Sequence, residues 1–151
     1  MKVAVLMENT AQEGCGLVPE HGLSLYIEYR GKRLLLDGGA SGRFADNAQK
    51  LGVDLADVDL GVLSHGHYDH ADGLRRFFQL NQRAKVYVRP QAGGPYFSMT
   101  EEGPKFIGVH RDIWEGARER LVPVPGPMEL LEGGWLLPDG HNIHRRYPEV
   151  A

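Results

Sequence analysis

Short apolar runs and a period-two alternation predict strands along the first part of the chain. Lys2–Met7 is a compact apolar run. In Leu23–Tyr29 every second residue, starting with Leu23, is apolar, which is typical of a half-buried strand. A turn at residues 30–32 leads into Arg33–Asp37, whose apolar centre predicts the buried second strand of a hairpin. The polar, glycine-rich stretch Asn9–Gly22 is expected to be a long loop.

Apolar residues at helical spacing predict helices between the strands. The first runs from Ser41 to Leu51, with Ser41 as a candidate N-cap and Gly52 just beyond its end. Its apolar side consists of Phe44, Ala45, Ala48 and Leu51. The helical pattern resumes over Ala71–Leu80. Asp112–Glu115 has the spacing of a capping box that opens a short helix.

Further short strands are expected at Leu60–Ser64, Lys85–Arg89, Leu121–Val124 and Met128–Leu137, the last one bent at its two glycines. Gln91–His110 is expected to be mostly irregular. Together these elements predict a layered α/β chain, with one domain over residues 1–137 and a polar tail at 138–151.

Composition and charge narrow the class of protein. The chain has 151 residues, 42% of them hydrophobic, which is ordinary for one soluble domain. A net charge of −3 argues against a nucleic acid or an anionic membrane as partner. Cys15 is the only cysteine, so an internal disulfide and a cysteine-based metal site are excluded. Without a recognisable leader or a spanning apolar run, we expect a cytoplasmic protein.

A dense cluster of metal-ligand side chains follows the strand at Leu60–Ser64. His65, His67, Asp69 and His70 fall within six residues, a chance match on the order of one in a thousand for this composition. Neutral imidazole and carboxylate suit zinc, and also iron or manganese. A solvated polar loop is the weaker explanation, because three protonated histidines would repel one another. The sequence therefore predicts a site for one or two divalent metal ions.

At these residues the chain resembles the metallo-β-lactamase superfamily, in which a His-x-His-x-Asp-His loop follows a buried strand. The resemblance extends from Met1 to about Leu137 and includes Leu36-Asp37-Gly38-Gly39, where the family commonly shows Asp-Thr-Gly. The motif sequence Ser-His-Gly-His-Tyr-Asp-His, together with Phe-Ile-Gly at residues 106–108, is most similar to the branch of the family named for dihydropterin and ribofuranosylaminobenzene phosphate synthases.

The resemblance implies that this chain is the N-terminal half of an αββα sandwich. It also implies His65 and His67 on one metal, Asp69 and His70 on a second, and Asp37 as a carboxylate that orients a ligand histidine. Family members are usually longer, and their second half supplies another histidine, a bridging acidic residue and a final histidine. Because we find no counterpart after residue 137, we expect a homodimer or another chain that supplies the second half of the sandwich.

Other candidate residues carry weaker signals. His141 and His144 have a spacing that can chelate a metal, but flanking prolines and glycine favour a solvated tail. His21 and His110 are expected to be surface or hydrogen-bonded residues rather than site residues. Arg89 suits an anionic substrate by its bidentate geometry, although solubilising charge explains it more simply.

Three functions remain open from the sequence. The first is a metal-dependent hydrolase that activates water to attack an ester, amide or phosphoester of a small molecule, with Asp69 also orienting that water. The second is a non-catalytic or incomplete metal-binding half-domain that acts through self-association or a partner. The third is a synthase-like transferase for pterin or phosphoribosyl-aromatic substrates. Specificity depends on pocket loops, so the sequence does not choose the substrate.

Overall fold

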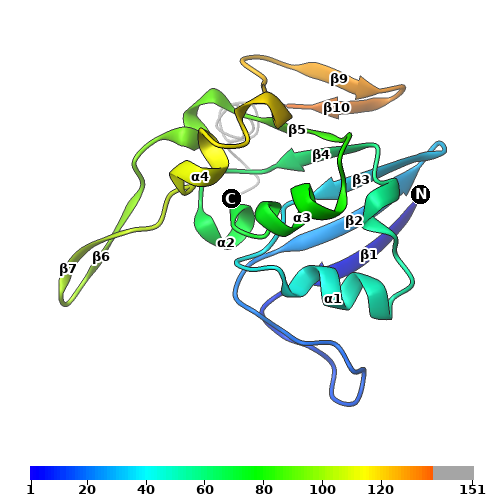
Figure 1. The fold of residues 1–151 in the computed structure, drawn as a ribbon, viewed down its shortest axis with the longest axis horizontal. Coiled ribbons are helices and arrows are strands. Elements are labelled where there is room, and N and C mark those ends of the chain that lie inside the picture. The colour runs from blue at the N-terminus through cyan, green and yellow to red at the C-terminus, as the bar shows by residue number, and fades with distance from the viewer. Residues whose placement is uncertain (138–151) are drawn as a thin grey trace, which may run out of the picture.

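A six-stranded mixed sheet forms the centre of the computed structural model, which describes residues 1–137 (Figure 1). The strand order is β1-β2-β3-β4-β5-β8, with antiparallel pairing from β1 to β3 and parallel pairing from β3 to β8. The strands are β1 (Lys2–Met7), β2 (Ser24–Tyr29), β3 (Lys32–Leu36), β4 (Leu60–Leu63), β5 (Lys85–Val88) and β8 (Leu121–Pro123). Six strands expected from the sequence are thus confirmed to within one residue at each end.

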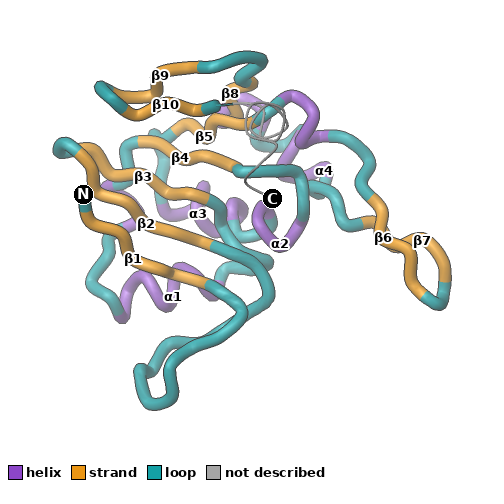
Figure 2. Tube along the Cα trace, turned by 180° about the vertical axis from the view of Figure 1, so that it is seen from behind, coloured by secondary structure: helices purple, strands orange, loops and turns teal. Residues whose placement is uncertain are grey.

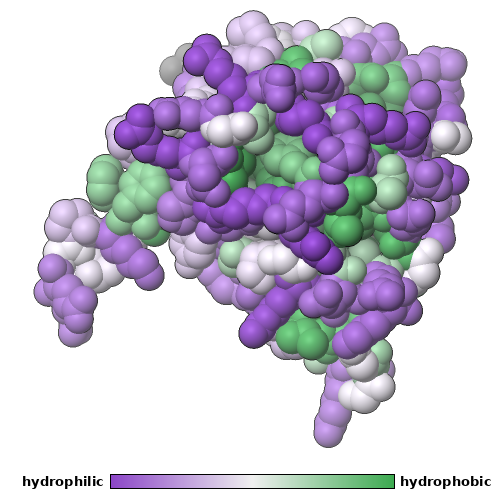
Figure 3. Space-filling model, viewed as in Figure 1, coloured by the Kyte–Doolittle hydropathy of each residue, from purple (hydrophilic) through white to green (hydrophobic). Residues whose placement is uncertain are grey.

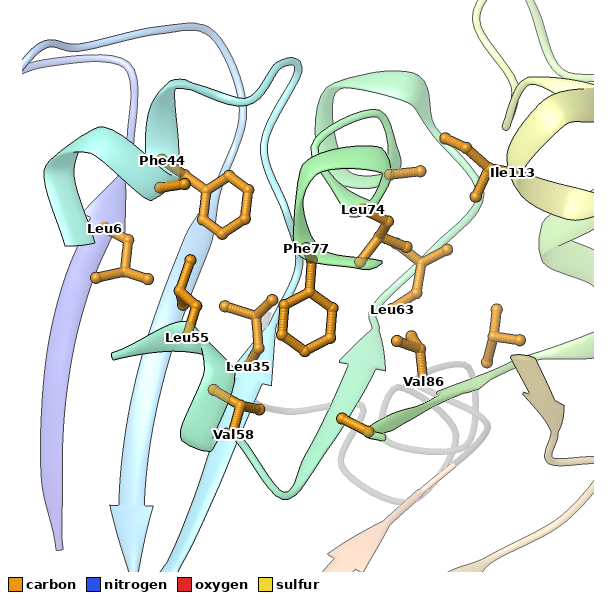
Figure 4. Close-up of a cluster of buried hydrophobic side chains, with 14 of the residues drawn as sticks. Leu6, Leu35, Phe44, Leu55, Val58, Leu63, Leu74, Phe77, Val86 and Ile113 are labelled. Carbon is orange, nitrogen blue, oxygen red and sulfur yellow. The ribbon is translucent and has the colours of Figure 1, made fainter. Parts of the chain in front are cut away.

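In the described part of the chain, four short α-helices accompany the sheet: α1 (Arg43–Lys50), α2 (Tyr68–Ala71), α3 (Leu74–Leu80) and α4 (Arg111–Trp114). The hydrophobic core lies between the sheet and the helices α1 and α3 (Figure 4). Phe44 of α1 and Phe77 of α3 are completely buried, and they point toward the sheet, where Leu35 and Val86 lie. Each of these helices packs only one side against the sheet, which explains why its apolar residues recur at helical spacing.

Three details of the expected helices are wrong. The N-cap of α1 is Gly42 rather than Ser41, although the Ser41 hydroxyl still accepts a hydrogen bond from the Arg43 N–H at 3.2 Å. Leu51 is the C-cap residue just beyond the last helical residue, and its side chain is 43% exposed rather than part of the buried side of the helix. The pattern expected over Ala71–Leu80 is divided between the end of α2 and α3.

The face of β2 that is most buried is not the one with the regular apolar pattern. Ser24 and Tyr26 are buried, whereas Leu25 and Ile27 are only half-buried. The Ser24 hydroxyl donates to the Asp37 carbonyl at 2.8 Å, and the Tyr26 hydroxyl donates to Glu28 at 2.9 Å. These hydrogen bonds satisfy the polar groups on the helix-covered side. The alternation of apolar and polar residues therefore predicts the strand correctly, but it assigns the more buried side to Leu25 and Ile27 instead of Ser24 and Tyr26.

Two regions contain hairpins that the sequence did not predict. Residues 91–110, expected to be irregular, contain the antiparallel pair β6 (Phe97–Thr100) and β7 (Gly103–Phe106), which projects from the body (Figure 1). The single bent strand expected over Met128–Leu137 is a hairpin of β9 (Met128–Leu131) and β10 (Gly134–Leu136). Gly133 has a φ of +75° at the turn, so the glycines reverse the chain rather than bend a continuous strand.

The capping box expected at Asp112–Glu115 does not form. Helix α4 begins at Arg111, after an N-cap at His110 without a side-chain hydrogen bond. The Asp112 carboxylate instead accepts from Arg75 at 2.8 Å, which links α4 to α3. Tertiary ion pairing has replaced the local cap.

Among residues 1–137, no helix covers the second face of the sheet (Figure 2). The β9–β10 hairpin packs near part of it and encloses, with β2, β3 and β4, an apolar cavity of about 200 Å³. Leu60 and Val62 of β4 are only 9% exposed, so this part of the sheet is covered within the chain itself. Toward the sheet edge, Val3 and Val5 remain 49% and 47% exposed. By contrast, the helix side is mostly hydrophilic, with hydrophobic residues in separate patches (Figure 3).

Within the part of the chain that the structure describes, none of the helices has the length and apolar character needed to cross a lipid bilayer.

Candidate metal centre

The four motif residues lie where the central strand β4 ends and α2 begins. His65 and His67 are on the connecting loop, and Asp69 and His70 belong to α2 rather than to the loop expected from the sequence. The ring centroid of His65 lies 4.6 Å from that of His67 and 4.2 Å from that of His70. The Asp69 Oδ2 lies 3.5 Å from the His70 Nε2. The structure therefore brings all four side chains into one cluster.

The backbone around Gly66 explains why this cluster is compact. A Cβ at Gly66 would lie 2.2 Å from the Ala92 carbonyl oxygen and 2.7 Å from the Ala92 Cα, so only glycine allows the two backbones to approach. On the other side, the Tyr68 N–H donates to the Ile107 carbonyl at 2.9 Å. The loop is held between two later segments of the chain.

Asp37, which follows β3, supports the cluster from beneath. Its side chain is fully buried, and its carboxylate accepts the Ser64 N–H at 2.7 Å and the Ser64 hydroxyl at 2.6 Å. The same carboxylate lies 2.7 Å from the His70 Nδ1. Asp37 thus joins the ends of β3 and β4 to α2, and a buried carboxylate with these partners is well satisfied.

The hydrogen bonds of Ser64 and Asp37 also define which ring nitrogens of His65 and His70 are available to bind a cation. The hydroxyl proton of Ser64 goes to Asp37, so the Ser64 Oγ accepts from the His65 Nδ1 at 2.9 Å. His70 likewise donates from Nδ1 to Asp37. In the neutral rings, both Nε2 atoms therefore keep a free lone pair, which is the form of histidine that binds metals.

The electrostatic environment acts in opposite directions on these two histidines. Burial lowers the pKa of His65, and the neighbouring His70 and His67 lower it further. Burial also acts to lower the pKa of His70, but the hydrogen bond to Asp37 and the charges of Asp37 and Asp69 outweigh it and raise the pKa. His65 is thus biased toward the neutral ring that can coordinate a cation.

The remaining sequence candidates have different places. The Nδ1 of His110 lies within hydrogen-bond distance of the Asp72 Oδ1, at 2.8 Å, so His110 has its partner outside the cluster. Arg89 donates to the Pro125 carbonyl at 3.1 Å. His141 and His144 lie outside the described residues. His21, expected to be a surface or hydrogen-bonded residue, has a side chain that is 67% exposed, and its Nε2 lies 3.3 Å from the Asp69 Oδ2. No local pattern around His21 signals this contact, because the two residues are 48 positions apart.

The donors of the cluster fit a divalent transition metal by their chemistry. They are imidazole nitrogens with a defined tautomer and a carboxylate, supported by a buried carboxylate on one imidazole. In residues 1–137, however, no group of three or more His, Cys, Asp or Glu side chains is close enough to hold an ion as it stands. To hold an ion, these side chains would have to draw closer together, or further ligands would have to join them.

Comparison with known proteins gives the same picture. The family model described as the metallo-beta-lactamase superfamily matches residues 17–145. An uncharacterized protein of Methanocaldococcus jannaschii is 32% identical over 114 residues, which cover 75% of this chain and 42% of that protein. From the same organism, 7,8-dihydropterin-6-methyl-4-(beta-D-ribofuranosyl)-aminobenzene-5'-phosphate synthase is 28% identical over 88% of this chain and 48% of its own.

A solved structure agrees in fold. The crystal structure of a metal-dependent hydrolase of the beta-lactamase superfamily superposes with a TM-score of 0.67 and 28% identity, over 89% of this chain and 46% of that one. The chain thus spans about half the length of these relatives. It provides one sheet with its helices, the N-terminal half of the two-sheet αββα fold. From the family match over most of its length, together with the motif and the fold, the chain belongs to the metallo-beta-lactamase superfamily.

Proposed function

We propose that this chain binds a divalent transition metal through His65, His67, Asp69 and His70 and takes part in metal-dependent hydrolysis. The observation that carries the proposal is the hydrogen-bond network of Asp37 and Ser64, which engages the Nδ1 atoms of His65 and His70 and leaves the Nε2 lone pair of each neutral ring for a cation. Zinc is the first candidate for an imidazole and carboxylate site, with iron and manganese as alternatives, and the cluster suits one or two ions.

Each residue has a distinct part in this proposal. A bound metal would lower the pKa of a water toward 7 and polarise a carbonyl or phosphoryl oxygen of an ester, amide or phosphoester. His65, His67 and His70 would bind and orient the cation, while Asp69 would bind it and also orient the attacking water. Asp37 fixes the ring of His70 and strengthens it as a ligand through Nδ1.

A synthase-like transferase reaction is a second candidate. It is supported by the 28% identity to the relative named as a dihydropterin ribofuranosylaminobenzene phosphate synthase. The two candidates differ in substrate: a pterin or phosphoribosyl-aromatic compound for the transferase, and a hydrolysable ester, amide or phosphoester for the hydrolase. Product analysis with both substrate classes distinguishes them.

A non-catalytic role is the third candidate, because residues 1–137 contain no closed set of three or more ligands. In both catalytic candidates another chain, in the simplest case a second copy, covers the open sheet face at Val3 and Val5 and adds ligands to the site. A small-molecule substrate then binds at the shared site.

Metal content measured together with molecular mass tests the proposal. We expect the purified wild type to retain a divalent transition metal in elemental analysis, and the His67→Ala/His70→Ala double variant to lose it. His110→Ala is the matched control, because His110 pairs with Asp72 outside the cluster. Equal stoichiometry in the wild type and the double variant contradicts the assignment. Metal in an assembly that turns over neither substrate class supports the non-catalytic role.

A further inference from the structure

The long loop before β2 returns to the cluster at Gly22, where two backbones meet. A Cβ at Gly22 would lie 2.0 Å from the Asp69 carbonyl oxygen, and the φ of Gly22 is +123°. Only glycine allows this approach at this backbone conformation. The adjacent residue His21 is thereby placed over Asp69, with its Nε2 3.3 Å from the Asp69 Oδ2.

A chain of hydrogen bonds defines the orientation of His21. The Gly22 N–H donates to the Asn9 Oδ1 at 3.0 Å, which fixes the direction of the Asn9 amide. The Asn9 Nδ2 therefore faces the His21 Nδ1, at 3.4 Å, and is the donor of that pair. A neutral ring that accepts at Nδ1 carries its proton on Nε2, the nitrogen that faces Asp69.

We propose that His21 is a positioning residue that donates from Nε2 to Asp69 and holds its carboxylate for metal binding. This rests on the proposed function, in which Asp69 is a ligand. The arrangement mirrors the Asp37–His70 pair, with histidine and carboxylate exchanged: a buried carboxylate orients a ligand imidazole there, and an imidazole orients a ligand carboxylate here. Since 67% of the His21 side chain is exposed, it also forms the solvent-facing rim of the cluster.

The hydrogen bond itself is tested in the metal-free protein by NMR. Long-range ¹H–¹⁵N spectra report which ring nitrogen of His21 carries the proton. We expect the Nε2–H tautomer in the wild type and a mixture of tautomers in Asp69→Ala and in Asn9→Ala. A His21 ring protonated at Nδ1, or a tautomer that does not respond to Asp69→Ala, overturns the proposal.

Metal affinity tests whether the contact matters for Asp69. In competition with a chelating dye for Zn²⁺, His21→Ala should bind about 10-fold more weakly than the wild type, whereas His21→Gln, which keeps a donor, should retain most of the affinity. In the Asp69→Ala background the same His21→Ala change should have an effect of less than about twofold, because its partner is gone. His110→Ala should bind as the wild type does.

The outcomes separate this inference from the function on which it rests. An unchanged affinity in His21→Ala, or an equal loss in both backgrounds, overturns the positioning role while metal binding stands. If the wild type takes up no metal, the proposed function fails, and the tautomer of His21 with its response to Asp69→Ala decides whether His21 holds Asp69. Thermal unfolding of each variant shows that the compared proteins are folded.

Discussion

The Oδ2 of Asp37 lies 2.7 Å from the Nδ1 of His70, although the two residues are 33 positions apart. Asp37 is fully buried at the end of β3, and His70 lies on α2. The same carboxylate accepts the N–H and the hydroxyl of Ser64. One buried group therefore sets both the direction of a histidine ring and the position of the loop that carries His65.

Asp37→Asn tests this support. The amide cannot accept at both of its side-chain atoms, so His70 or Ser64 loses a partner. We expect metal affinity to fall by roughly 10- to 100-fold while the protein still folds. Titration against a chelating dye, with circular dichroism for folding, measures this. The exposed Asp46 provides the matched control Asp46→Asn, and an affinity unchanged in Asp37→Asn removes Asp37 from the site.

Phe77→Ala tests the core between the sheet and α3. Phe77 is completely buried, so its truncation should lower the free energy of unfolding by about 3–5 kcal/mol. Urea unfolding measures the change. Phe97 on the projecting hairpin is 58% exposed, and Phe97→Ala should change stability by less than about 0.5 kcal/mol. Similar losses in the two variants would contradict the position of the core.

Tyr26 provides a test at alkaline pH. Burial, together with the hydrogen bond and negative charge of Glu28, raises the pKa of Tyr26 to about 12 from 10.0. The folded state favours the neutral phenol, so its contribution to stability is fully present below pH 10 and is lost as the pH rises from 10 through about 12. The difference between the tyrosinate absorbance titrations of the wild type and Tyr26→Phe isolates this group. A midpoint near 10 in that difference contradicts the buried environment of Tyr26.

The open sheet face leads to a prediction about assembly. Val3 and Val5 expose apolar side chains on β1, so we expect a second copy to cover them at micromolar concentration. Sedimentation equilibrium should give twice the chain mass of 16.8 kDa for the wild type and mainly the monomer mass for Val5→Lys. Met99→Lys, on the projecting hairpin, should leave the mass unchanged. A well-folded wild-type monomer refutes this association.

Several features of this protein depend on local sequence and were predictable from it. The strands of the central sheet and the amphipathic helix that contains Phe44 follow from the spacing of apolar residues. Side chains return to the same side every two residues in a strand and every three to four residues in a helix, so this spacing is visible in the sequence. The cluster from His65 to His70 was also evident, since its donors are adjacent in the chain. The resemblance to the family led to the expectation that Asp37 orients a ligand histidine, and Asp37 does contact His70.

Other features were decided by tertiary structure. Alternation in β2 could not tell which face the helices cover, and Ser24 and Tyr26 are buried there because distant groups satisfy their polar atoms. Asp112 had the spacing of a cap but pairs with Arg75 on another helix. His21 contacts Asp69 only because Gly22 lets a long loop return against α2. Contacts between residues far apart in the chain leave no periodic or local pattern, so only the folded chain reveals them.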